Sequence, residues 1–161
     1  MEGFMSRDAV LSISETDIID ICCQIEETCA CLYRHFALVY AETPPAADLW
    51  EKTAKEEDNH AAQFHLAHRL LGVGLKSFNT DIKTAASLLE KIQTVYANVQ
   101  KNPPRLREAL HFAISLEKAM SAYHMHAIAN FEDKSLEKLF IAMMKSDEQH
   151  IEMLVNALEA L

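Results

Sequence analysis

The sequence predicts an all-α fold in which two helical hairpins are joined by a long connector. Its 161 residues include only 3 Gly and 4 Pro, fewer than a sheet protein with many tight turns would need. Good helix formers, above all Ala, Leu, Glu and Lys, are abundant. Apolar residues also recur at steps of three and four over long stretches, which is the period of an amphipathic helix.

The first half of the chain predicts one helical hairpin, over residues 14–71. Its first helix is expected to begin near Ser12 to Asp17, where two capping boxes can form, so that residues 1–13 make a loose N-terminal segment. A Pro-Pro pair then interrupts the pattern. The second helix is expected from about Ala46 to Leu71, and a Gly-Val-Gly sequence follows it.

The second half of the chain predicts another hairpin, over residues 105–161. As a single helix these residues would be about 85 Å long, too long for a compact domain of this size. The polar stretch 130–135 can supply the break, and Ser135 can cap the helix that follows. Residues 75–102 are more weakly patterned and are expected to form a partly helical crossover, so that residues 1–161 make a single four-helix-bundle domain.

Charge and composition exclude several classes of partner. The formal net charge is −9 and no basic stripe is present, so we expect no binding to nucleic acid or to an anionic membrane. The sequence has no apolar run long enough to span a bilayer, and its first residues do not resemble a secretory signal. The four cysteines lie close together without a CxxC spacing, which argues against a cysteine-only zinc site. Reduced thiols and a cytoplasmic location are expected.

Two of the predicted helices carry an acid and a histidine three residues apart. Glu57 and His60 share a helix face, and small and apolar residues around them point that face into the bundle. Asp147 and His150 have the same spacing in the second hairpin, among Met, Ile and Leu residues. Each pair could also face solvent, because its immediate neighbours are polar.

Each of the other two helices places an acid among apolar neighbours. In the second hairpin this acid is Glu117, which could instead pair with Lys118. In the first hairpin the choice lies between Glu26, whose face carries cysteines, and Glu27, whose face includes Asp20 and is expected to be wetter. We favour Glu26.

The order of these acids and histidines repeats between the two halves. From Glu26 to His60 is 34 residues, and from Glu117 to His150 is 33. Inward carboxylates that stayed charged and uncompensated would each cost several kcal/mol. Two divalent cations would neutralise four of them, with neutral histidines filling the remaining positions.

These motifs resemble the rubrerythrin-like branch of the ferritin-like superfamily. The resemblance runs from about residue 14 onward and rests on Ile25-Glu26-Glu27 with Tyr33, on Glu57-x-x-His60, and on the segments Ala113–Lys118 and Asp147–Leu154. It implies a ferritin-like four-helix bundle with two divalent metal ions, most often iron, although zinc and manganese are alternatives. The ligands that it implies are Glu26, Glu57, His60, Glu117, Asp147 and His150. Either Glu57 or Glu117 would bridge the metals.

Two features depart from the family pattern. Asp147 stands where the family has a glutamate, and its shorter side chain could reach one metal only or shift that metal. The rubredoxin-like cysteine module is missing, so electrons would come from a separate donor protein. His124 lies seven residues after Glu117 and could approach the site as an extra ligand or as a hydrogen-bond donor to one.

The resemblance implies an oxidoreductase that reduces hydrogen peroxide or dioxygen at the metal pair, in a protein that forms a homodimer. The first alternative is a bundle that binds or handles metal without turnover, which peroxide would oxidise slowly or not at all. The second is a helical interaction module whose acids line a wet groove, which would bind no stoichiometric metal.

Overall fold

The computed structural model describes the backbone of residues 7–69, 82–127 and 134–161. These residues form five helices and no strand, which confirms the predicted all-α fold. The helices are α1 (Arg7–Val39), α2 (Pro44–Arg69), α3 (Ile82–Lys101), α4 (Leu106–Ala127) and α5 (Lys134–Glu159). Within these described parts, no helix has the length and apolarity that crossing a bilayer requires.

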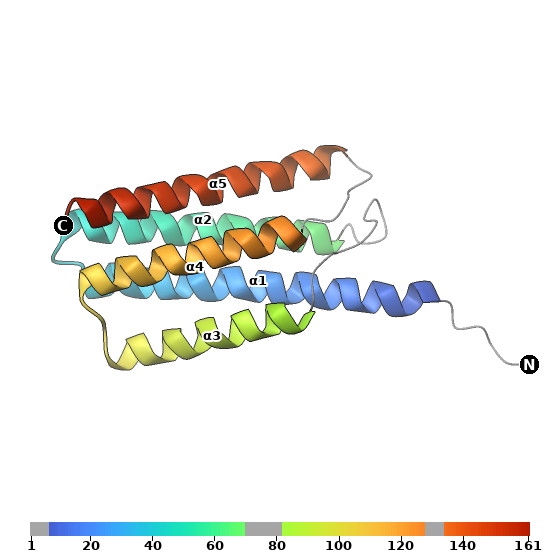
Figure 1. The fold of residues 1–161 in the computed structure, drawn as a ribbon, viewed down its shortest axis with the longest axis horizontal. Helices are drawn as coiled ribbons and strands as arrows, with labels where there is room; N and C mark the ends of the chain where they lie inside the picture. Colours follow the sequence, from blue (N-terminus) through green and yellow to red (C-terminus); the bar gives the residue numbers. More distant parts are fainter. Residues whose placement is uncertain (1–6, 70–81, 128–133) are drawn as a thin grey trace, which may run out of the picture.

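The helices form two hairpins, α1–α2 and α4–α5, and α3 lies between them in the sequence (Figure 1). Helix α1 packs antiparallel to α2, helix α4 packs antiparallel to α5, and α2 also contacts α5. Helix α3 lies along α1 and returns the chain to the end of the bundle where α2 began, so α2 and α4 run in the same direction. This is the connectivity of a bundle with one long crossover, and α3 is the helical part of that crossover.

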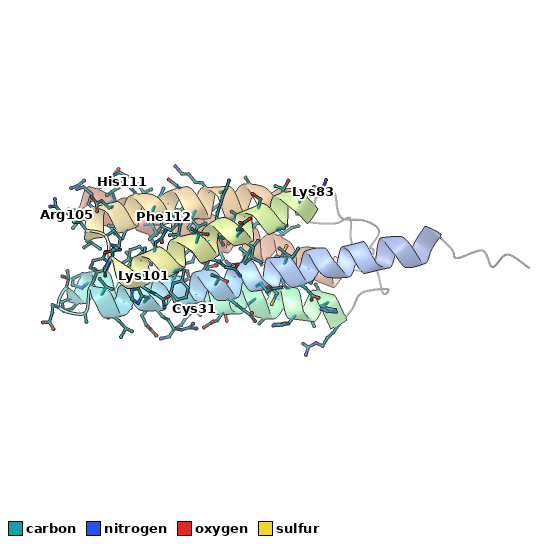
Figure 2. The ribbon with its side chains drawn as sticks, turned by 90° about the horizontal axis from the view of Figure 1, so that it is seen from below. Cys31, Lys83, Lys101, Arg105, His111 and Phe112 are labelled. Atoms are coloured by element: carbon teal, nitrogen blue, oxygen red, sulfur yellow. The ribbon has the colours of Figure 1, made fainter. Side chains whose placement is uncertain are left out.

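Proline and a capping carboxylate set the ends of the helices near the crossover. Pro44 is the first residue of α2, where a missing N–H costs nothing because that group has no intrahelical partner. Before α4, the backbone N–H of Arg105 donates a hydrogen bond of 3.0 Å to the carboxylate of Glu108, as in the second half of a capping box. The corner from Lys101 to Arg105 lies at one end of the bundle (Figure 2).

Two predicted boundaries differ from the structure. Helix α1 begins at Arg7, before Ser12, so residues 7–13 are helical and not a loose segment. No Gly or Pro lies between Gly3 and the end of α1, and serines near a helix start are tolerated inside it, so the possible caps do not end the helix there. Ser135 lies inside the first turn of α5, which begins one residue earlier, and so does not cap it.

The other predicted boundaries agree with the structure where it describes them. Helices α4 and α5 are separate, so residues 105–161 are not one helix, and most of the predicted break at residues 130–135 lies outside the described residues. Leu71, the predicted end of the second helix, also lies outside them. The predicted crossover is helical over most of its length.

Aromatic residues fill the core between α1 and α2. Trp50 is fully buried and packs against Phe36, with ring centroids 4.9 Å apart, and against Tyr33, with centroids 5.6 Å apart. Leu32 and Leu110 belong to the same apolar cluster, which therefore joins the first hairpin to α4. This packing fixes the helices that carry the buried acids described next.

Candidate metal centre

Six buried polar residues from four helices meet inside the bundle. Glu26 lies on α1, Glu57 and His60 on α2, Glu117 on α4, and Asp147 and His150 on α5. None is more than 2% exposed. Each acid–histidine pair that the sequence suggested is therefore inward-facing, and the reading in which these pairs face solvent is wrong.

The first half of the site is arranged around His60. Its Nδ1 atom faces three carboxylate oxygens, at 3.6 Å from Glu26 Oε2, 3.4 Å from Glu57 Oε2 and 3.3 Å from Asp147 Oδ1. Glu26, Glu57 and His60 offer donor atoms within 4.8 Å of one another, close enough to hold one ion. Asp147 thus reaches the histidine of the other hairpin, across the bundle.

The second half of the site is arranged around His150. Its Nδ1 atom lies 3.1 Å from Glu57 Oε1 and 3.6 Å from Glu117 Oε2. Glu57 therefore turns one oxygen towards each histidine and belongs to both groups of donors, whereas Glu117 belongs to one. Of the two bridging candidates that the sequence left open, Glu57 is the one that faces both histidines.

Burial and like charge make this cluster costly without a cation. Burial raises the pKa of Glu57, and nearby Glu26 raises it further. Burial likewise raises the pKa of Glu117, and Glu57 adds to the effect. Each carboxylate therefore resists ionisation, because its charge is removed from water and placed beside another acid.

The same surroundings favour the charged form of the two histidines. Burial alone would lower the pKa of His60, but Glu26 and Glu57 overcome it and raise the pKa to about 11. At His150 burial also acts downward, and Glu117 and Glu57 raise the pKa to about 10. The imidazoles thus supply positive charge where the acids need it, which a divalent cation would supply in their place.

The donor atoms fit a pair of divalent cations. Both oxygens of Glu57, both ring nitrogens of His60 and Nδ1 of His150 are buried, and none makes a hydrogen bond of ordinary geometry to a described residue. Buried polar atoms normally have such partners, and converging donors without them are the pattern of a metal site. Four carboxylates and two neutral imidazoles balance two divalent ions in charge.

Comparison with protein families adds a second line of support. The family model described as Rubrerythrin matches residues 17–158, which spans all six buried polar residues. The chain belongs to the rubrerythrin family. Comparisons with curated proteins and with solved structures found no match.

Two further side chains of this rubrerythrin domain hold the site residues in place. Glu56 lies beside Glu57 on α2, and its Oε2 atom is 2.5 Å from His150 Nε2, on the side of the ring opposite the donor cluster. The Tyr33 hydroxyl donates a hydrogen bond to Glu117 Oε1, which leaves Oε2 directed at His150. Partners of this kind fix the orientation and tautomer of a ligand.

Sequence reasoning missed Glu56 and took Tyr33 only as part of the family pattern. A polar run surrounds Glu56, so nothing in the sequence separates it from solvent-facing neighbours. The sequence left two candidate acids on the first helix. Glu26 is buried in the cluster, whereas Glu27 is exposed on the outside of the same helix. The side chain of His124 lies outside the described residues.

Proposed function

We propose that the buried cluster holds two iron ions and that the protein reduces hydrogen peroxide, or dioxygen, with electrons from a separate donor protein. The observation that carries this proposal is the position of Glu57, whose two oxygens each face a different histidine. A carboxylate shared in this way holds two ions side by side, as two-metal chemistry requires.

The donor set supports iron without excluding its competitors. Buried imidazoles and carboxylates suit iron, zinc and manganese, and none of the six donors is a thiolate that would favour a softer ion. Membership of the rubrerythrin family favours iron among these. In this assignment Glu26, Asp147 and His60 would hold one ion, Glu117 and His150 would hold the other, and Glu57 would offer one oxygen to each.

Reduction of peroxide to two waters consumes two electrons and two protons. A bound pair of ferrous ions would supply this electron pair, and the external donor would replace it. The chain's own residues keep the site dry and hold protons near it. The hydroxyl of Tyr33 stays protonated because burial and then Glu117 raise its pKa, so its proton remains on the hydrogen bond to Glu117.

The burial of the site favours one alternative, a protein that stores or senses metal without turnover. All six residues are at most 2% exposed, so the site is shielded from oxidants in the solvent. Asp147 is also shorter than the glutamate of the family pattern, which can weaken one half of the centre. Both functions use the same ligands and differ in their reaction with peroxide.

Anaerobic iron loading tests the proposal. We expect about two iron ions per chain in the parent protein after desalting, and a large loss in a His60→Ala, His150→Ala double variant. When the ferrous protein is mixed rapidly with peroxide, we then expect fast oxidation of the iron. Addition of a chemical reductant should restore the ferrous form, so that oxidation and reduction can be repeated. Replacement of His111, a histidine of α4 outside the cluster, by Ala serves as the matched control.

Each outcome separates the functions. Two ions with slow or absent oxidation would support metal storage over catalysis. One ion per chain would mean that Asp147 has disabled one half of the centre. Near-zero metal in the parent and in the double variant would refute the metal centre. We also propose that the protein forms a homodimer and acts in the cytoplasm. Light scattering of the purified chain tests the homodimer.

A further inference from the structure

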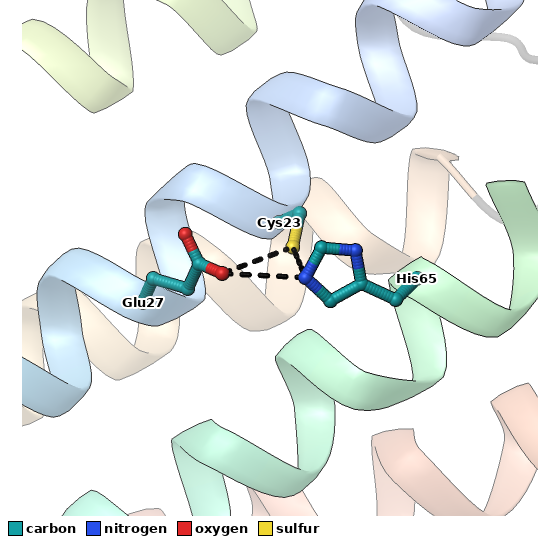
Figure 3. A group of neighbouring side chains, drawn as sticks. All are labelled: Cys23, Glu27 and His65. Carbon is teal, nitrogen blue, oxygen red and sulfur yellow. Dashed lines mark hydrogen bonds and ion pairs between the residues drawn. The ribbon is translucent and has the colours of Figure 1, made fainter.

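A second group of metal-binding side chains lies on the outside of the α1–α2 hairpin. Cys23 and Glu27 stand one turn apart on α1, and His65 faces them from α2. Figure 3 shows the three side chains pointing towards one another across the seam between the helices. None of them belongs to the buried cluster of six.

The three donor atoms form a nearly regular triangle. Cys23 Sγ lies 3.1 Å from His65 Nε2 and 3.7 Å from Glu27 Oε1, and the last two atoms are 3.3 Å apart. Tetrahedral zinc with Zn–S of about 2.3 Å and Zn–N and Zn–O of about 2.0–2.2 Å would space sulfur about 3.6 Å from either partner and the other two about 3.4 Å apart. A cation just above the plane of the triangle could therefore bind all three atoms.

The surroundings suit a zinc ion with one open position. The thiol is buried, at 5% exposure, while the side chains of Glu27 and His65 are 55% and 60% exposed. The sulfur is thus shielded on the protein side, and the fourth position faces water. Asp20 Oδ1 and His68 Nδ1 lie 2.7 Å apart across the same two helices and help to hold them together.

We propose that Cys23, Glu27 and His65 bind one zinc ion, with water in the fourth position, and that this ion clamps α1 to α2. A thiolate, an imidazole and a carboxylate at tetrahedral spacing favour zinc over the harder manganese and magnesium ions. Burial and then Glu27 raise the pKa of the free Cys23 thiol to about 12, so binding of the ion would have to displace the thiol proton.

Cobalt(II) distinguishes this site from the buried centre, because only the outer site has a cysteine ligand. Anaerobic titration of the full-length, metal-free chain with cobalt(II) should produce the near-ultraviolet charge-transfer band of a cobalt–thiolate bond. The band should disappear in Cys23→Ser and in His65→Ala, and should remain in Cys31→Ser, which alters an exposed cysteine of the same helix. It should also remain in the His60→Ala, His150→Ala variant.

Zinc competition against a chromophoric chelator gives the affinity. We expect at least a tenfold weaker outer site in Cys23→Ser and His65→Ala, because even residues beyond the ligands alter metal affinity about 10–100-fold. His65→Ala changes a largely exposed side chain and so keeps the test valid if Cys23→Ser folds poorly. Absence of the band in the parent, or its persistence in His65→Ala, would overturn the proposal. Neither result depends on iron in the buried centre.

Discussion

Replacement of Glu57 by glutamine should remove most of the stabilisation that metal binding confers, although it changes a single carboxylate. Glu57 belongs to both donor groups, so its loss weakens both ion positions at once. Glu117 belongs to one group, so Glu117→Gln should weaken only the His150 position. The two variants remove the same chemical group from the same buried cluster and therefore form a matched pair.

The size of the effect follows from mass action. An ion present at 100 times its dissociation constant stabilises the folded state by about 2.7 kcal/mol, so two independent sites would contribute about 5 kcal/mol. In a chain of this length each kcal/mol shifts the melting temperature by about 2–4 °C. Metal should thus raise the melting temperature of the parent by about 10–20 °C, of Glu117→Gln by about half of that, and of Glu57→Gln by little.

Calorimetry at one fixed free concentration of manganese(II) measures these shifts. Manganese suits carboxylates and imidazoles but not thiolates, so it reports on the buried centre rather than on Cys23. Without metal, Glu57→Gln should melt lower than the parent, because it removes a carboxylate that faces both buried imidazoles. The metal-induced shift is therefore measured within each variant, with and without manganese. The reasoning is refuted if Glu57→Gln retains a metal-induced shift as large as that of Glu117→Gln.

Three further predictions concern the acid–base chemistry, the core and the surroundings of the ligands. The pKa values of His60 and His150, raised to about 11 and about 10, stabilise the metal-free fold fully below about pH 6.5 and lose that contribution as pH rises through the folded values. The metal-free protein should therefore melt lower near pH 9 than near pH 6 by calorimetry, and an equal or higher melting temperature near pH 9 would contradict this. Trp50→Ala should lower the free energy of unfolding by about 3–5 kcal/mol in urea titrations followed by circular dichroism, because Trp50 is fully buried; a loss below about 1 kcal/mol would show that the core repacks around the cavity. Glu56→Gln should weaken metal binding about 10–100-fold in chelator competition, and unchanged affinity would mean that its contact with His150 does not orient the ring.

The helices and the six buried site residues were predictable because both follow from short-range rules. Pro-Pro pairs interrupt the helical period at the start of α2 and before α4, and an acid and a histidine three residues apart share a helix face. The start of α1 was not predictable from caps, since Ser12 lies inside the helix that begins at Arg7. A residue that can cap a helix does not have to do so.

Contacts between helices were the part that the sequence could not supply. Asp147 was paired with His150 because the two share a face, yet its oxygen also lies 3.3 Å from His60 on a helix of the other hairpin. The group of Cys23, Glu27 and His65 was missed for the same reason, because it depends on the register of α2 against α1. The spacing of residues in the sequence shows which side chains share one face of a helix. The register between two helices is set by packing along their whole length.

The order of the helices along the chain has a consequence for synthesis. Glu26, Glu57 and His60 all lie on α1 and α2, so the first hairpin to leave the ribosome already carries all the donors of the His60 position except Asp147. The set around His150 is incomplete until α4 and α5 reach Glu57, so the second position arises only when the late half docks on the early half. In the proposed assignment the nascent chain would acquire its ions in sequence, and occupancy of the second would mark a finished molecule.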